Sequence, residues 1–215
     1  MSEFKNMDCM EGMKQYPDKY FDLAIVDPPY GIGVDGGIGG GVMAKKSSFI
    51  KKGWDNQPPK KEYFDELIRV SKNQIIFGAN HFISNIPINS SCWIVWDKLN
   101  GENNFADCEL AWTSFKTSVR KFDYKWQGML QGDMKNKEFK IHPTQKPVAL
   151  YEWLLKNYAK EGDKILDTHV GSASSLIACY NLGFEYVGFE LDKEYYDKAQ
   201  KRLQARMAQM DIFNL

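Results

Sequence analysis

The chain has 215 residues, 43% of them hydrophobic, which suits one domain with a sizeable core. Its 28 basic and 28 acidic side chains give a net charge of zero, which disfavours proteins that bind nucleic acid through overall positive charge. No apolar run of about 18 residues and no apolar leader is present, so neither a membrane span nor a secretory signal is expected. The four cysteines and three histidines lack metal-ligand spacing, so we expect reduced thiols, no metal and a cytoplasmic location.

The first third of the chain predicts two strands that flank a short helix. Residues 3–8 predict a strand that ends at Asp8, and residues 9–16 predict the helix. The apolar run 21–26 (FDLAIV) predicts a buried parallel strand. The segment from about 31 to 58 predicts a mobile loop, because its glycine run is followed by a lysine-rich stretch. A formal G-x-G-x-x-G lies in that run, but no helix can start on it, so we interpret the match as accidental.

The middle of the chain predicts one helix and three strands. Residues 60–70 have the apolar spacing of a helix, and residues 74–77 and 92–96 are typical of buried strands. Residues 106–115 alternate well enough for a strand near the edge of the sheet. Residues 116–140 show no clear period and are rich in lysine, glycine and glutamine. We therefore expect a small recognition insertion there.

The last third predicts a regular alternation of helices and strands. A helix over residues 148–158 precedes a strand at 164–166, and a helix that ends at Leu182 precedes a strand at 186–189. Asp192 then begins a long charged helix. This alternation predicts an α/β fold with a doubly wound, mostly parallel sheet, helices on both faces and an antiparallel strand at its edge.

The tetrapeptide Asp27-Pro28-Pro29-Tyr30 directly follows the strand predicted at residues 21–26. The prolines end the ladder and hold the chain rigid, so an acid and an aromatic are fixed at the carboxyl end of a strand, where ligands bind in open α/β sheets. Asp27 and the Pro28 carbonyl can both accept hydrogen bonds from one NH2 group, and Tyr30 can stack on the ring that carries it. The alternative is an ordinary strand followed by a Pro-Pro turn.

A second candidate site is predicted between two later strands. Asp167 ends one strand, and Gly171 and Ser172 form a small-residue turn before a helix, whose N-terminus favours an anionic group. Glu190 ends the next strand, a position that suits contact with ribose hydroxyls. This pattern predicts a nucleoside site without separating NAD from S-adenosylmethionine, and an ordinary βαβ unit with solvated acids is the alternative.

The two sites together resemble the amino-methyltransferases of DNA, and the order of motifs is similar to that of their beta group. The resemblance rests on four blocks, DLAIVDPPY (22–30), HPTQKP (142–147), LDTHVGS (166–172) and YVGFE (186–190), and also on the segment 93–115. It implies a Rossmann-like methyltransferase fold and S-adenosylmethionine as the cofactor. One departure is Ala173, which follows Ser172 where the family has glycine in D-P-F-x-G-S-G, and another is His169, which replaces an aromatic apolar residue.

The resemblance also implies roles for single residues. Asp27, Pro28, Pro29 and Tyr30 would form the catalytic block. The HPTQKP block and Asp167 would bind the methionine end of the cofactor, together with the turn that follows Asp167. Glu190 would bind its ribose, and Asp8 would contact its adenine. The residues named for this cofactor site are Asp8, His142, Thr144, Lys146, Asp167, Gly171, Ser172 and Glu190.

Two basic stretches are candidates for contact with double-stranded DNA. The first contains Lys45, Lys46, Lys51 and Lys52, and the second contains Arg120, Lys121, Lys125 and Trp126. Lysines and arginines interleaved with aromatic side chains fit phosphate contact combined with base stacking. A solvated surface loop is the alternative for each stretch.

The predicted reaction is transfer of a methyl group to adenine N6 in duplex DNA, with the base flipped out of the helix. Adenine is favoured over cytosine N4, since the family's cytosine members more often carry serine at the position of Asp27. The alternatives left open are cytosine N4, a protein or RNA amine, a module that has lost catalysis and a nicotinamide-dependent oxidoreductase. The sequence also leaves open whether the protein acts alone or as a homodimer.

Overall fold

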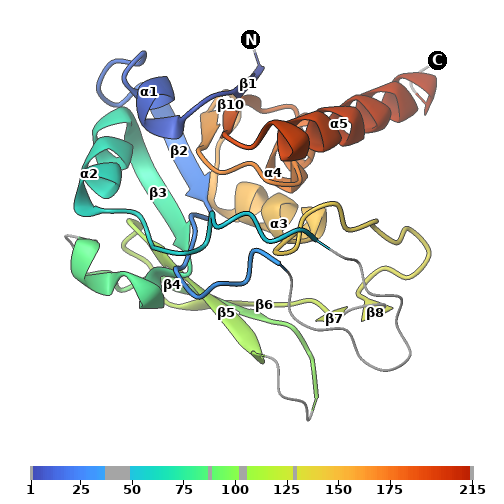
Figure 1. Cartoon of the computed structure of the whole chain (residues 1–215), viewed down its shortest axis with the longest axis horizontal. Helices are drawn as coiled ribbons and strands as arrows, with labels where there is room; N and C mark the ends of the chain where they lie inside the picture. Colours follow the sequence, from blue (N-terminus) through green and yellow to red (C-terminus); the bar gives the residue numbers. More distant parts are fainter. Residues whose placement is uncertain (1, 37–48, 87–88, 102–105, 128–129, 214–215) are drawn as a thin grey trace.

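The computed structural model describes residues 2–36, 49–86, 89–101, 106–127 and 130–213 (Figure 1). Within these residues the chain forms an eight-stranded sheet. Its order is β1 (Glu3–Asn6), β10 (Glu185–Glu190), β9 (Lys164–Asp167), β2 (Phe21–Val26), β3 (Ser71–Phe77), β5 (Cys108–Thr113), β4 (Trp93–Asp97) and β6 (Arg120–Asp123).

The sheet is mostly parallel, as predicted. The strands from β1 to β3 pair in parallel, and β6 pairs in parallel with β4. β5 runs antiparallel to both of its neighbours, β3 and β4. The antiparallel strand therefore lies inside the sheet, and its predicted edge position is wrong. Local alternation can predict a strand, but the edge is formed by β6, whose polar sequence RKFD gave no strand signal.

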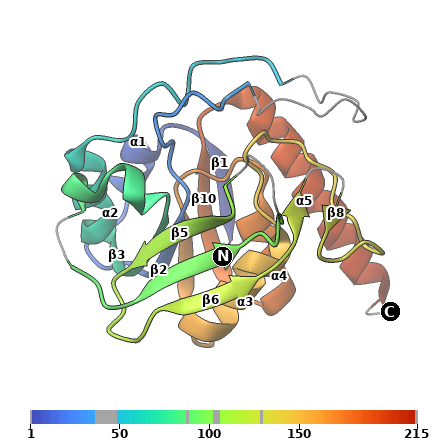
Figure 2. The ribbon, with the colours of Figure 1, turned by 90° about the horizontal axis from the view of Figure 1, so that it is seen from below.

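Helices cover both faces of the sheet, as predicted (Figures 1 and 2). Successive side chains of a strand point to opposite faces, so Leu23 and Ile25 of β2 join one core cluster while Ala24 and Val26 join the other. The first cluster packs under α3 (Val148–Tyr158), α4 (Ser174–Leu182) and α5 (Lys193–Phe213). The second packs under α1 (Cys9–Met13) and α2 (Lys61–Val70).

The segment 116–140, predicted as an insertion, contributes to two sheets. Its first part is β6 of the main sheet, and β7 (Trp126–Gln127) pairs with β8 (Leu130–Gln131) in a separate two-stranded sheet. The 3-10 turns η1 (Ala79–His81) and η2 (Ile83–Asn85) follow β3. No helix within the described residues is long and apolar enough to cross a membrane.

Two buried aspartates tie together the ends of the loop predicted at about 31–58. Asp55 accepts hydrogen bonds from the amides of Gly31 (2.8 Å) and Val34 (2.9 Å). Asp35 accepts from the amides of Lys52 (2.9 Å) and Gly53. These bonds hold the described parts of the loop beside each other, and residues 37–48 lie outside the description.

Candidate active site

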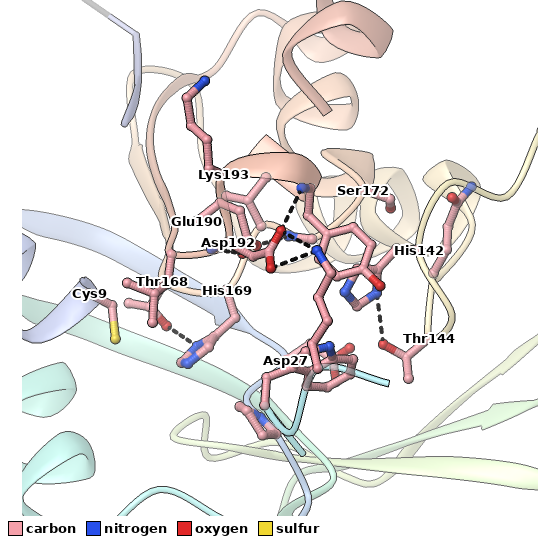
Figure 3. Close-up of a pocket in the computed structure, with 18 of the residues that line it drawn as sticks. Cys9, Asp27, His142, Thr144, Thr168, His169, Ser172, Glu190, Asp192 and Lys193 are labelled. Atoms are coloured by element: carbon pink, nitrogen blue, oxygen red, sulfur yellow. Dashed lines mark hydrogen bonds and ion pairs between the residues drawn. The ribbon is translucent and has the colours of Figure 1, made fainter. Parts of the chain in front are cut away.

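A cavity of about 660 Å³ opens where β1, β2, β9 and β10 end. This volume lies in the range of pockets that bind drug-sized ligands. Figure 3 shows side chains from distant parts of the chain around it, among them Asp27, His142 and Glu190. Because one cavity joins the end of β2 to the end of β10, both sites predicted from the sequence share one space.

The predicted catalytic block, Asp27 to Tyr30, follows β2 as expected. Asp27 and Pro29 line the cavity, while Pro28 is buried. The Tyr30 hydroxyl donates a hydrogen bond to Oδ1 of Asp27 at 2.6 Å. One face of the Tyr30 ring stacks on His81, with 5.0 Å between ring centroids and 14° between planes. The carboxylate and the aromatic ring are thus fixed relative to each other.

Lys146 brings a buried positive charge to this carboxylate. Its ammonium contacts Oδ2 of Asp27, lies 3.1 Å from Oε2 of Glu109 and donates to the Tyr30 hydroxyl at 3.2 Å. Only 3% of the Lys146 side chain is exposed. Lys98 lies 2.5 Å from Oε1 of Glu109. Two acids and two bases therefore form a cluster beside the cavity, in which Lys146 is buried and the other three side chains are partly exposed.

Burial and charge pull the pKa values of this cluster in opposite directions. Burial disfavours the ammonium of Lys146, but Asp27 and Glu109 outweigh this effect and raise its pKa. Burial also disfavours an ionised Glu109, but Lys146 and Lys98 lower its pKa to about 2. Burial raises the pKa of Asp27, and Lys146 and Tyr30 limit that rise.

The sequence predicted Lys146 as a contact of the cofactor. Lys146 does line the cavity, but its ammonium is held by Asp27, which lies 119 residues away in the chain. Glu109 and Lys98 were missed as members of the site. Glu109 falls in a segment with family resemblance, but no local pattern predicts that its side chain reaches Lys146.

Glu190 is placed as predicted for a ribose contact. It ends β10, lines the cavity, and accepts hydrogen bonds from the amides of Gly171 and Asp192, both at 2.9 Å. Burial raises its pKa. Gly171 and Ser172 also line the cavity, and Gly171 has a φ of 54°, a conformation that favours glycine. The turn before α4 therefore presents its backbone to the cavity.

Asp167 does not line the cavity, which corrects the contact predicted for it. Its side chain is 2% exposed and accepts from the amide of His169 (2.9 Å) and from the Ser175 hydroxyl. Burial raises its pKa to about 7. Asp167 thus stabilises the turn that lines the cavity, because its carboxylate bonds are made within that turn and the start of α4.

The HPTQKP block covers the turn on its other side. A Cβ atom at Gly171 would lie 3.6 Å from the His142 ring, and Nδ1 of His142 lies 3.1 Å from the Thr144 hydroxyl. Burial lowers the pKa of His142 to about 3, so the ring is neutral. His142 and Thr144 both line the cavity, as Figure 3 shows. The structure thus brings together the two blocks predicted for the cofactor.

Asp8 and His169 lie on the wall of the cavity as well. Asp8 caps α1 by accepting from the amides of Met10 (2.8 Å) and Glu11 (3.2 Å). Nδ1 of His169 lies 2.9 Å from the Thr168 hydroxyl, which lies 2.6 Å from the Tyr63 hydroxyl. Burial lowers the pKa of His169 to about 4. His169 is therefore a neutral, packed part of the wall.

The first basic stretch gives a mixed result. Lys45 and Lys46 lie outside the described residues, and Lys51 is exposed. Lys52 lines the cavity, but its ammonium already has acidic partners. Its ammonium pairs with Asp192 (2.8 Å) and Glu194 (2.9 Å) and lies 4.5 Å from the centroid of the Tyr195 ring. Its charge is therefore used to hold the 49–54 segment against the start of α5.

The second basic stretch is also only partly available. Arg120 is exposed, Lys125 is half-buried, and Lys121 pairs with Asp97 (2.9 Å) and Asp123 (3.0 Å). The stacking role predicted for Trp126 is wrong. Its side chain is buried in the core, and its indole donates to the Gln145 carbonyl at 2.8 Å. Its place on β7 under the HPTQKP block leaves no face for a base.

A family model described as DNA methylase, with the label N6_N4_Mtase, matches residues 21–201. The chain belongs to this DNA methylase family. This membership confirms the predicted beta-group amino-methyltransferase, a site-specific DNA methyltransferase that uses S-adenosylmethionine.

Relatives cover nearly the whole chain. The type II methyltransferase M2.DpnII of Streptococcus pneumoniae is 29% identical over 92% of this chain and 88% of that protein. The type II methyltransferase M.HpaI of Haemophilus parainfluenzae is 26% identical over 95% of this chain and 74% of that protein. The solved complex of M1.HpyAVI with S-adenosylmethionine has a similar fold, with a TM-score of 0.59 and 23% identity over 94% of this chain and all of that chain.

Proposed function

We propose that this protein transfers a methyl group from S-adenosylmethionine to the N6 amine of adenine in double-stranded DNA. The observation that carries the proposal is the shared cavity, which is lined by Asp27 directly after β2 and by Glu190 at the end of β10. A carboxylate that can accept from an amine and a carboxylate that can accept from a ribose thus face the same space.

The cavity wall suits the proposed cofactor. Glu190 already accepts two amides, and each of its oxygens keeps a lone pair for a ribose hydroxyl. The N-terminal end of α4 and the neutral His142-Thr144 pair suit the polar methionine end. Asp8 lies on the cavity wall between β1 and α1, and its carboxylate suits a hydrogen bond from the adenine amine. S-adenosylmethionine, when bound, supplies an electrophilic methyl group on a positively charged sulfur.

Asp27 and the Pro28 carbonyl would act on the target amine. The lone pair of adenine N6 is delocalised into the ring, which makes the amine a poor nucleophile. Hydrogen bonds from its two N–H groups to Asp27 and to the Pro28 carbonyl favour a tetrahedral nitrogen and so restore the lone pair. Holding the amine in line with the methyl group supplies on the order of 7–11 kcal/mol in well-oriented reactions. Asp27 is also the nearest carboxylate for the proton that the amine loses.

Adenine is the proposed base because of Asp27. At this position, the family's cytosine N4 members more often carry serine. Cytosine N4 is the second candidate, since the matching family model covers both kinds of amine. Exposed Lys51 and Arg120 are the proposed phosphate contacts among the described residues. Of the other three basic candidates, Lys52 and Lys121 are paired with acids and Lys125 is half-buried.

The test is transfer of labelled methyl from S-adenosylmethionine to unmethylated duplex DNA, with single-stranded RNA and bulk protein as competing acceptors. We expect label in the DNA, and a loss of about 100-fold or more for Asp27→Ala with cofactor binding retained. Asp18→Ala is the matched control, because Asp18 is a surface acid whose partner is Arg69. Label in RNA or protein alone, or no transfer to DNA that carries many sequences, would overturn the proposal.

A further inference from the structure

The partly buried cluster of Asp27, Glu109, Lys146 and Lys98 carries an inference about how the reaction is controlled. The two carboxylates both lie within reach of one hydroxyl, since Tyr30 Oη is 2.6 Å from Asp27 and 3.5 Å from Glu109. Lys146 contacts both carboxylates, and Lys98 contacts the second oxygen of Glu109, Oε1. The cluster is therefore neutral only while both ammonium groups are present.

Lys146 has little freedom to leave this position. Its side chain is 3% exposed, and its Nζ lies 5.0 Å from the centroid of Phe77 and 5.6 Å from that of Tyr30. Glu109 lies on β5, which pairs with β3 inside the sheet, so its carboxylate is carried by a rigid strand. The ammonium is thus held between two fixed acids and two aromatic rings.

Two nearby buried carboxylates without a shared cation tend to hold one proton between them, because like charges disfavour the second ionisation. A protonated Asp27 has one acceptor fewer and gives a weaker hydrogen bond to an amine. The group that the proposed reaction needs is the carboxylate form.

We propose that Lys146 and Glu109 are a positioning pair that sets the charge of Asp27: the ammonium of Lys146 keeps Asp27 ionised to accept the target amine, and the like charge of Glu109 opposes that ionisation. The inference rests on the proposed function and deepens it. It assigns Lys146 to the methyl acceptor, whereas the sequence motif had suggested the cofactor. Other titratable groups that face the cluster are Tyr63, His81, Lys140, His142, Tyr151 and Asp167.

The experiment follows the ionisation of Asp27 by carbon-13 NMR titration, with Asp27→Asn to assign its signal. It uses the wild type, Lys146→Met, Glu109→Gln and the double variant. We expect the Asp27 midpoint to rise by about two pH units or more in Lys146→Met and to fall in Glu109→Gln. In the double variant, the titration midpoint of Asp27 should lie about one pH unit or more closer to the wild-type value than in Lys146→Met, because the second carboxylate is then gone.

Activity gives the second readout. In Lys146→Met the acidic limb of the pH profile of kcat should move up with the Asp27 midpoint, and kcat at pH 7 should fall by about tenfold or more. Adding Glu109→Gln should recover part of that loss. The Kd for S-adenosylmethionine should stay within about threefold of the wild-type value in all variants, since the pair acts on the acceptor side.

Two results would overturn the inference. One is an unchanged Asp27 midpoint in both single variants. The other is a Lys146→Met variant that binds S-adenosylmethionine more weakly and shows no rescue by Glu109→Gln, as expected for a cofactor contact. If Lys146→Met does not fold, Glu109→Gln still tests the inference, which requires the titration midpoint of Asp27 to fall in that variant. A wild type without methyl transfer would reject the proposed function, while the NMR titration would still test the pair.

Discussion

Gly78 lies so close to Tyr30 that a Cβ atom on Gly78 would be 2.0 Å from Cε1 of the tyrosine ring. Gly78 follows β3, has a φ of 67°, and its amide donates to the Leu110 carbonyl at 2.9 Å. The glycine is therefore held by β5 and forms the surface on which the Tyr30 ring rests.

Gly78→Ala should reduce methyl transfer by displacing Tyr30. The added methyl group cannot fit without a shift of the ring, which also moves the hydroxyl that donates to Asp27. We expect kcat to fall by about tenfold or more and the Kd for S-adenosylmethionine to be unchanged.

The matched control is Gly183→Ala. Gly183 has a φ of 76°, but nothing lies within 4 Å of its added Cβ atom. Both substitutions should cost about 1 kcal/mol of stability from backbone strain, and the control should keep full activity. Equal losses of activity in the two variants would show that strain alone, and not contact with Tyr30, explains the effect.

Glu190→Gln should weaken the binding of S-adenosylmethionine. The amide side chain has lost the charge that makes a carboxylate a strong acceptor, and its NH2 group faces a backbone N–H of Gly171 or Asp192. A loss of about 1.5–3 kcal/mol, or roughly 10- to 100-fold in Kd, is expected by calorimetry. Glu185→Gln, at the exposed start of the same strand, should bind normally. An unchanged Kd for Glu190→Gln would place the ribose elsewhere.

His169→Phe should make the protein more resistant to acid. The pKa of His169 is about 4 in the folded state, below its unfolded value of about 6.5, so the unfolded state takes up the proton first. The stability associated with the neutral ring is fully present above pH 6.5 and is lost as the pH falls towards 4. Between pH 7 and 5, the free energy of unfolding of the variant should improve by about 1–2 kcal/mol relative to the wild type.

Urea unfolding of both proteins at pH 7, 6 and 5 measures this difference. Asp167 and His142 contribute equally to both proteins, and the lost hydrogen bond to Thr168 adds an offset that does not depend on pH. Parallel stability curves for the two proteins would contradict a lowered pKa of His169.

Much of the fold was predictable because its strongest signals are local. The apolar run FDLAIV predicted β2, and the apolar spacing of residues 60–70 predicted α2, which begins one residue later. β6 was missed because its sequence RKFD has the polarity of a loop and becomes a strand by pairing with β4. The position of β5 inside the sheet depends on pairing between distant strands, which spacing cannot reveal.

The site was predictable where a motif fixes the backbone and unpredictable where side chains meet across the fold. Ala173 illustrates the first case: the departure from glycine was visible in the sequence, and the residue adopts a φ of 63°. Trp126 illustrates the second, since an aromatic among lysines suggests stacking, but its contact with Gln145 buries it. The pairing of Lys146 with Asp27 also depends on tertiary packing, so the motif alone could not predict it.

The most direct test of the central claim is to identify the methylated nucleoside. Unmethylated duplex DNA is treated with S-adenosylmethionine and either the wild type or Asp27→Ala, digested to nucleosides and analysed by mass spectrometry. We predict N6-methyladenine from the wild type and none above background from Asp27→Ala. N4-methylcytosine in place of N6-methyladenine would contradict the choice of base, and equal N6-methyladenine from both proteins would contradict the role of Asp27.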